Sequence, residues 1–306
     1  MSFKRLIRFV STDSKVYFGD AIVPSTTTPE TFDPRFTKEA HVIVGDVFSS
    51  SYTITNQIKP VAQLLCPIAP SQLGTVRLIG LNYSKHAAEL GSPKPKFPVG
   101  FYKPATAAAG PNDSIIVPRF AQVVGNPNDP KDTKPQVDYE TELVVVIGKA
   151  GTNIPKDKVS EYILGYSVGN DVSQRTWQIA RGGSQFTTGK MFDTWAPFGP
   201  AIVSPSVVGN PNDLQISSYV NGELRQDSTT GDMIFDVVEL VHFLSQGTTL
   251  MPGDIIWTGT PGGVAAGMKD PKWLQDGDVC VCKLEKVGTV QNKVVFEKDG
   301  FRDWKL

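Results

Sequence analysis

Residues 138–148 join an acidic segment directly to an apolar one, and this junction constrains the fold more than any other part of the chain. The segment reads Asp-Tyr-Glu-Thr-Glu over 138–142 and Leu-Val-Val-Val-Ile-Gly over 143–148. The β-branched run is typical of a buried strand. Because side chains alternate faces along a strand, Asp138, Glu140 and Glu142 are expected to point the same way.

Three carboxylates on one strand face are tolerated only in a few environments. They repel one another and lose hydration on burial, so they need a cation, a shared proton or open water. Oxygen-only ligands of this kind suit Mg²⁺, Mn²⁺ or Ca²⁺. The alternative is an exposed strand end with three solvated acids. The pattern therefore predicts either a divalent-metal site or a solvated strand end.

A fourth acid, Asp171, stands where it can complete such a site. It follows a predicted strand over 163–168 and the turn Gly169-Asn170, where side chains project from the end of a sheet. Two glutamates and one aspartate leave coordination positions open for water or substrate, as a catalytic metal requires. The alternative is that Asp171 caps the helix predicted to follow it.

Composition limits the classes of partner. The chain has 306 residues with 30 basic and 31 acidic side chains, a formal net charge of −1. A nucleic-acid-binding protein needs a basic surplus, so this class is excluded. No apolar stretch approaches the length of a membrane span, which excludes a membrane partner. A small-molecule ligand is the remaining expectation.

The first residues allow two interpretations of cellular location. Lys4, Arg5 and Arg8, without an early acid, are compatible with a mitochondrial presequence. However, apolar alternation continues through residues 16–18 into Gly19-Asp20, which favours a hairpin that belongs to the fold. Three cysteines without a disulfide framework indicate a reducing compartment. We therefore expect a cytoplasmic protein, with a mitochondrial one as the alternative.

The pattern of turns and strands predicts two domains. Residues 1–70 form a small module with short strands and a helix ending near Pro60. Residues 71–306 contain many short strands, few helices and a long surface loop over 123–136. An amphipathic helix is expected over 236–245. The fold class is therefore α+β, mainly β, with helices on the outside.

Two further segments carry residues suited to catalysis. His86 and Glu89 stand at i and i+3 of a predicted helix over 84–90, so they are neighbours on one face. A carboxylate beside an imidazole suits a general base, although a solvated surface pair is the alternative. Lys190 follows Gly189 in a stretch without periodicity, where it either stabilises developing negative charge or faces solvent.

Six segments around these residues occur in a fixed order that is characteristic of one family. They are GLNYSKHAAE (80–89), ETE (140–142), GNDVS (169–173), GKMFD (189–193), PFGP (197–200) and TGTPGGV (258–264). From about residue 75 to the end, the chain resembles the fumarylacetoacetate hydrolase family. The resemblance is closest to the second eukaryotic subgroup of domain-containing proteins, whose pattern FYKP (101–104) also matches.

The resemblance carries expectations for the architecture and the metal. It implies a β-roll catalytic domain over 71–306, a small N-terminal α/β domain over 1–70, and a homodimer. It also implies that Glu140, Glu142 and Asp171 hold Mg²⁺, or Mn²⁺ or Ca²⁺ in its place. By this match Asp138 is a neighbour of the site and not a ligand.

The resemblance also assigns roles to other side chains. It implies that His86 and Glu89 form a water-activating pair on a lid helix and that Lys190 stabilises developing charge. The substrate contacts that we expect are Lys103, Arg175, Gln178 and Thr260.

The leading functional prediction is metal-dependent hydrolysis of a carbon–carbon bond. The substrate would be an acylpyruvate-like β-dicarbonyl 2-oxo acid, of the fumarylpyruvate or fumarylacetoacetate class. The same site also suits an oxaloacetate keto–enol tautomerase or decarboxylase. A third alternative is an inactive homologue that binds a metal and a 2-oxo acid without turnover.

Overall fold

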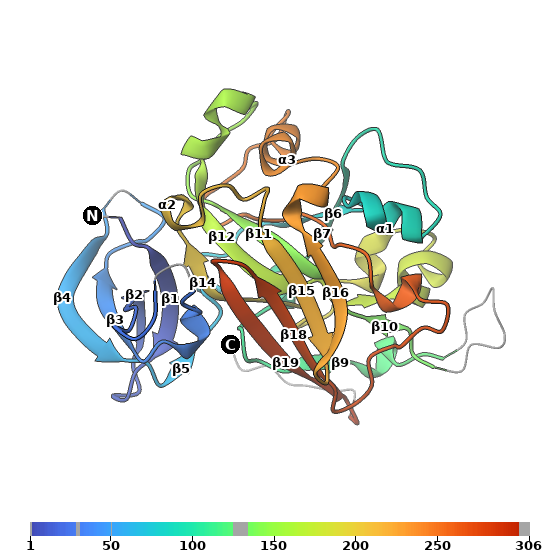
Figure 1. The fold of residues 1–306 in the computed structure, drawn as a ribbon, viewed down its shortest axis with the longest axis horizontal. Coiled ribbons are helices and arrows are strands. Elements are labelled where there is room, and N and C mark those ends of the chain that lie inside the picture. Colours follow the sequence, from blue (N-terminus) through green and yellow to red (C-terminus); the bar gives the residue numbers. More distant parts are fainter. Residues whose placement is uncertain (1, 29–30, 50, 125–133, 300–306) are drawn as a thin grey trace.

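Strands dominate the computed structural model, which describes residues 2–28, 31–49, 51–124 and 134–299 (Figure 1). The predicted mainly β, α+β class is confirmed. The largest sheet has the strand order β4-β3-β2-β1-β14-β12-β11-β17-β6-β7. In that order the strands are β4 (Thr53–Pro60), β3 (Glu39–Val44), β2 (Val16–Ala21), β1 (Arg5–Val10), β14 (Ala196–Val203), β12 (Ile163–Asn170), β11 (Thr141–Ile147), β17 (Ile255–Trp257), β6 (Val76–Gly80) and β7 (Val99–Lys103). Two short strands pair outside this path, β5 (Gln63–Leu64) with β1 and β8 (Ala108–Ala109) with β14.

A second sheet lies across the first. Its order is β16 (Glu223–Thr229), β15 (Gln215–Val220), β18 (Val279–Leu284), β19 (Gly288–Phe296) and β9 (Ile115–Val117). Figure 1 shows β15 and β16 in orange and β18 and β19 in red, in front of β11 and β12. A single buried apolar cluster contains Val145 and Ile256 from the large sheet and Ile216 and Val290 from the second. The two sheets therefore enclose a common core that covers one face of β11, while Val144 and Val146 on its other face belong to a second buried cluster.

Helices are few and lie outside the sheets. They are α1 (Ser84–Glu89), α2 (Pro205–Val208) and α3 (Val237–Leu244). The predicted helix over 236–245 is present as α3, because Asp236 and Glu239 form a reciprocal capping box at its start. Shorter helical turns are η1 (Pro34–Phe36), η2 (Ala105–Ala107), η3 (Arg119–Ala121), η4 (Lys156–Glu161), the π-helical η5 (Trp177–Arg181), η6 (Phe186–Gly189), η7 (Thr230–Asp232) and η8 (Ala265–Gly267). No helix among the described residues is long and apolar enough to cross a membrane.

The N-terminal module differs from its prediction in one respect. The segment expected to be a helix ending near Pro60 is the strand β4, and η1 is the only helical turn among the described residues up to 70. The cause is the partner strand, since β3 pairs with β4 over most of its length. Tertiary pairing thus overrides the local pattern.

The module is joined to the rest of the chain by backbone pairing. β1 and β2 form the expected hairpin, and β1 also pairs with β14 through Arg5 and Leu6. One sheet therefore runs from the N-terminal module into the remaining chain, while a domain boundary at residue 70 stays a prediction. Most of the predicted loop over 123–136 lies outside the described residues.

Candidate active site

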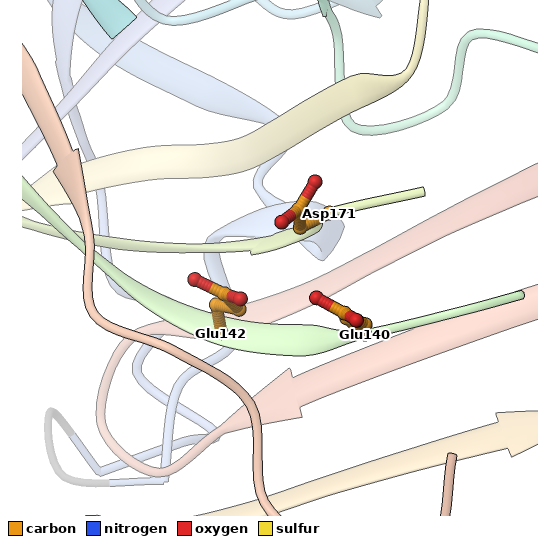
Figure 2. Close-up of side chains that lie close together, drawn as sticks. All are labelled: Glu140, Glu142 and Asp171. Carbon is orange, nitrogen blue, oxygen red and sulfur yellow. The ribbon is translucent and has the colours of Figure 1, made fainter. Parts of the chain in front are cut away.

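The three expected metal ligands meet at the paired ends of β11 and β12. These strands are antiparallel, with Thr141 opposite Asn170 and Glu142 opposite Gly169. This register carries Asp171 to Glu140, whose carbonyl accepts a 2.8 Å hydrogen bond from the Asp171 N–H. One carboxylate oxygen from each acid lies within 4.8 Å of the others. Figure 2 shows Asp171 facing the two glutamates from the neighbouring strand.

Burial decides between the alternatives that the sequence left open. The exposed fractions are 6% for Glu140, 1% for Glu142 and 0% for Asp171, so the acids do not form a solvated strand end. Asp171 does not cap a helix either, because the short strand β13 (Ser173–Gln174) follows it. Buried carboxylates in contact require a compensating positive charge.

Asp138 does not share the face of the two glutamates. The predicted strand is interrupted at residues 139–140, and Asp138 belongs to a separate strand, β10 (Val137–Asp138), which pairs with β13. Alternation of side chains holds only along a continuous strand. The expectation from alternation is therefore wrong for Asp138, which lies outside the three-carboxylate group.

Two buried lysines and the half-buried Arg175 surround the carboxylates. Lys190 Nζ lies 2.8 Å from Glu140 Oε2 and 2.6 Å from Asp171 Oδ2. Lys103 Nζ lies 2.6 Å from Asp171 Oδ1, and Arg175 Nη1 lies 2.6 Å from Glu140 Oε1. With Asp138 included, four carboxylates face three cations, which leaves one negative charge (−4 + 3 = −1). A divalent cation would make the group positive and suited to an anionic substrate.

The acids of the group differ in their electrostatic environment. Burial raises the pKa of Glu142 well above its usual value, and the neighbouring Asp171 and Glu140 add to the effect. Burial opposes ionisation of Glu140 too, but Lys190 and Arg175 outweigh it and hold that pKa well below its usual range. Burial also acts to lower the pKa of Lys190, yet its two carboxylate partners raise it overall. Lys190 is therefore a charged ammonium at neutral pH.

The donor set fits a hard divalent cation. Three carboxylates offer only oxygen atoms, from a buried position that keeps them close together without an ion. Mg²⁺, Mn²⁺ and Ca²⁺ prefer such ligands. The residues present can hold a divalent metal, and the choice among these three ions remains a prediction.

A cavity of about 310 Å³ opens beside the carboxylates. The predicted site residues that line it are His86, Glu140, Arg175, Gln178, Lys190 and Thr260. A volume of this order suits a small organic acid. The structure thus brings these six expected side chains to one cavity, whereas Glu89 and Lys103 do not line it.

His86 and Glu89 form the pair expected from their spacing on α1. His86 Nδ1 lies 3.2 Å from Glu89 Oε2, and His86 is 5% exposed. Glu89 also accepts hydrogen bonds from the Gly263 N–H at 3.0 and 3.1 Å. Glu89, although exposed, is therefore anchored to the glycine-rich turn at 258–264. The burial of His86 does not fit a solvated surface pair.

Lys103 does not occupy the place that we expected for it. It is buried and donates to the carbonyls of Val172 and Trp195 while it contacts Asp171. It is absent from the cavity lining. Lys103 is therefore placed against Asp171 and not at the surface of the cavity.

The sequence predicted no role for Gln226, although it connects parts of the site. Gln226 on β16 is fully buried, and its Oε1 accepts from the Thr141 N–H at 3.0 Å and from Ser218 at 2.8 Å. Its Nε2 donates to Thr260 Oγ1 at 2.7 Å and to the Pro261 carbonyl at 2.8 Å. Gln226 connects the carboxylate strand to the turn at 258–263. No motif marks it, because these contacts come from distant parts of the sequence.

Comparison with known proteins places this site in a family. The family model for the C-terminal region of fumarylacetoacetate hydrolase matches residues 75–295, which contain every residue of the site. The chain belongs to the fumarylacetoacetate hydrolase family. A solved structure of 2-hydroxyhepta-2,4-diene-1,7-dioate isomerase from Mycobacterium marinum shares its fold, with a TM-score of 0.76 and 33% identity. That comparison covers 97% of this chain and 100% of the isomerase.

Curated relatives in this family carry names for oxo-acid chemistry. The bovine protein named mitochondrial oxaloacetate tautomerase FAHD2B is 44% identical over 71% of this chain and 65% of its own length. A Dictyostelium discoideum relative, named fumarylacetoacetate hydrolase domain-containing protein 2 homolog, is 44% identical over 74% of this chain and 73% of its own length. The family is thus one of enzymes, but hydrolysis is not specifically supported.

The comparison also corrects the expected location. Relatives that are 40–44% identical to this chain are named mitochondrial, so the cytoplasmic prediction is wrong. The cytoplasmic prediction assumed that Arg5 and Arg8 belong to a hairpin, and both residues do lie in β1. A folded strand shows only that these residues belong to the domain, and it does not determine the compartment.

Proposed function

We propose that this chain is a divalent-metal-dependent keto–enol tautomerase acting on oxaloacetate or a closely similar 2-oxo dicarboxylic acid. The observation that carries the proposal is one small cavity lined by both His86 and Glu140, a member of the three-carboxylate group. Relatives named oxaloacetate tautomerase support this reaction over the hydrolysis that we first expected.

Tautomerisation moves one proton between C3 and the oxygen of the 2-oxo group. Glu89 engages Nδ1 of His86, which leaves Nε2 as the ring atom that takes up or delivers this proton. The Lys190 ammonium supplies positive charge where the enolate oxygen develops. A divalent cation held by the three carboxylates would polarise the 2-oxo group.

The substrate carboxylates require further donors in the cavity. Arg175, Gln178 and Thr260 line it and are our candidates for this contact. Thr260 is held in place because its hydroxyl donates to the Thr141 carbonyl at 2.9 Å and accepts from Gln226. Such fixed side chains orient a small acid without reorganisation.

Carbon–carbon hydrolysis remains a second candidate. The observation that favours it is the same His86–Glu89 pair, which can equally activate a water molecule. Decarboxylation of oxaloacetate needs the same charge-stabilising groups and is recognised by its product. We further propose a mitochondrial location by analogy with the named relatives. A homodimer is proposed from the family resemblance alone.

One comparison of substrates separates these activities. With Mg²⁺ present, the decay of enol-oxaloacetate and the cleavage of an acylpyruvate are followed by ultraviolet absorbance, with pyruvate formation measured in parallel. We expect the wild-type protein to accelerate enol-oxaloacetate decay and to leave the acylpyruvate intact. Cleavage of the acylpyruvate without any effect on oxaloacetate would instead establish the hydrolase.

His86→Ala tests the assigned base. We expect a loss of about 100-fold or more in tautomerisation, within the range for a general acid–base group. Lys85→Ala is the matched control, because Lys85 lies on the same helix and is exposed. Equal activity of His86→Ala and Lys85→Ala would contradict the role of His86.

A further inference from the structure

Asp138 is a buried acid that the proposed reaction does not use. It is 0% exposed and lies at the end of β10, just before the interruption that separates it from Glu140. A buried carboxylate is tolerated only when its oxygens are fully engaged. Its partners therefore show what it holds in place.

Each oxygen of Asp138 has several donors. Oδ1 accepts from the N–H groups of Tyr139 at 2.9 Å and Ala265 at 2.8 Å. Oδ2 accepts from the Ala266 N–H at 3.0 Å and from Arg175 Nε at 2.9 Å. Arg175 Nη2 adds an ion pair at 2.8 Å. One carboxylate thus ties Arg175 to the turn at 265–266.

The remaining nitrogen of Arg175 reaches the active site. Nη1 lies 2.6 Å from Glu140 Oε1 and donates to Gln178 Oε1 at 2.9 Å. Arg175, Gln178, Glu140 and Ala266 all line the cavity. The guanidinium therefore spans two carboxylates, one structural and one at the metal-candidate group, and its planar fork is needed for both.

We propose that Asp138 is a positioning residue for ligand binding, acting through Arg175. By engaging Nε and Nη2, it directs Nη1 to Glu140 and Gln178, and by engaging the Ala265 and Ala266 amides it fixes the cavity wall beside them. The expectation of which ligand is bound, a 2-oxo dicarboxylic acid, rests on the proposed function. The positioning role itself rests on the contacts of the carboxylate.

The first test is Asp138→Asn, which keeps the shape and removes the charge. In the Mg²⁺-loaded protein we expect KM for oxaloacetate and Kd for oxalate to rise about tenfold, as for the loss of one charge-assisted hydrogen bond. We expect kcat to change less than KM, because the His86–Glu89 pair does not contact Asp138. Unchanged oxalate affinity in the folded variant would overturn the proposal.

Asp254→Asn is the matched control. Asp254 is also buried, accepts from the N–H groups of Thr75 and Met251, and pairs with Arg77, but Arg77, unlike Arg175, does not line the cavity. This substitution is expected to lower the melting temperature without changing oxalate affinity. An equal loss of affinity in both variants would show a general structural effect and contradict the proposal.

A double-mutant cycle tests whether Asp138 acts through Arg175. Asp138→Asn should weaken oxalate binding in the wild-type background but have little further effect in an Arg175→Gln background. If the fold-losses of oxalate affinity in Asp138→Asn and Arg175→Gln multiply fully in the double variant, Asp138 does not act through Arg175 and the proposal is wrong. Because the cycle is read by calorimetry, it remains informative if the wild-type protein does not act on oxaloacetate, an outcome that would reject the proposed function alone.

Arg175→Lys provides an independent variant if Asp138→Asn does not fold. Lysine keeps the positive charge but cannot span both carboxylates with a rigid fork. We expect oxalate affinity to fall as it does in Arg175→Gln. Wild-type affinity in Arg175→Lys would show that the bridge from Asp138 to Glu140 is unnecessary, and the proposal would be wrong.

Discussion

Glu142 differs from the other two candidate ligands in its contacts. Glu140 and Asp171 each contact the Lys190 ammonium, whereas Glu142 accepts a 2.9 Å hydrogen bond from the Gly259 N–H. Among the described residues, no ion pair to Glu142 is found. In the metal-free protein, Glu142 is therefore the one of the three buried carboxylates with the least compensation from neighbouring positive charge.

This contrast predicts the behaviour of Glu142→Gln. Mg²⁺ affinity should fall at least about tenfold, because a charged ligand is lost while the shape remains. The metal-free variant should be as stable as the wild-type protein or more stable, since a buried unpaired charge is removed. Calorimetry with Mg²⁺ and thermal unfolding measure the two effects. Glu161→Gln, at an exposed position, is the control, and unaltered Mg²⁺ affinity in Glu142→Gln would contradict the ligand assignment.

At the scale of elements, the site depends on contacts between segments that are distant in sequence. β11 carries Glu142 and begins directly after Glu140, β16 supplies Gln226, and the turn after β17 carries Thr260. The buried Gln226 amide satisfies donors and acceptors from all of these segments. The second sheet thus takes part in the site as well as covering the core.

Gln226→Ala should therefore affect both stability and activity. It leaves the buried Thr141 N–H without its acceptor and the Thr260 hydroxyl without its donor, a loss of about 3 kcal/mol in the free energy of unfolding. The tautomerase rate should fall because the 258–263 turn is released. Urea unfolding and the oxaloacetate assay measure these changes. Gln215→Ala, at an exposed position of the paired strand β15, should leave both quantities close to wild type.

At the scale of the whole molecule, the large sheet connects the N-terminal module to the active site. β1 pairs with β14, β14 with β12, and β12 with β11, whose start carries the glutamates. The metal-candidate group therefore lies on a structure that spans most of the chain. Binding at this group is expected to stabilise the fold as a unit.

Metal binding should accordingly raise the melting temperature. At a free Mg²⁺ concentration 100 times its Kd, stabilisation of the folded state is about 2.7 kcal/mol. Thermal unfolding with Mg²⁺, and again with excess chelator, measures the difference. The chelator should reverse the shift in the wild-type protein. In Glu142→Gln, whose affinity is at least about tenfold weaker, the stabilisation at the same Mg²⁺ concentration should be at most about half as large. A shift of equal size in both proteins would indicate binding elsewhere.

The sequence by itself determined the chemistry of the candidate site. It identified the apolar run of β11, the capped helix α3, the His86–Glu89 spacing and the three oxygen-donating acids. These depend on residue type and local periodicity, which the chain carries within a few positions. The family followed from the order of the same segments.

The tertiary structure alone decided where these groups stand relative to one another. It separated Asp138 from Glu140 by ending β10, placed Lys103 against Asp171, made β4 a strand, and brought Gln226 to the carboxylate strand. Each outcome follows from a contact, a strand pairing or a hydrogen bond between segments that are distant in sequence. The local pattern of one segment does not show which other segment it will contact. Local sequence thus fixed which groups are present, and long-range pairing fixed which of them meet.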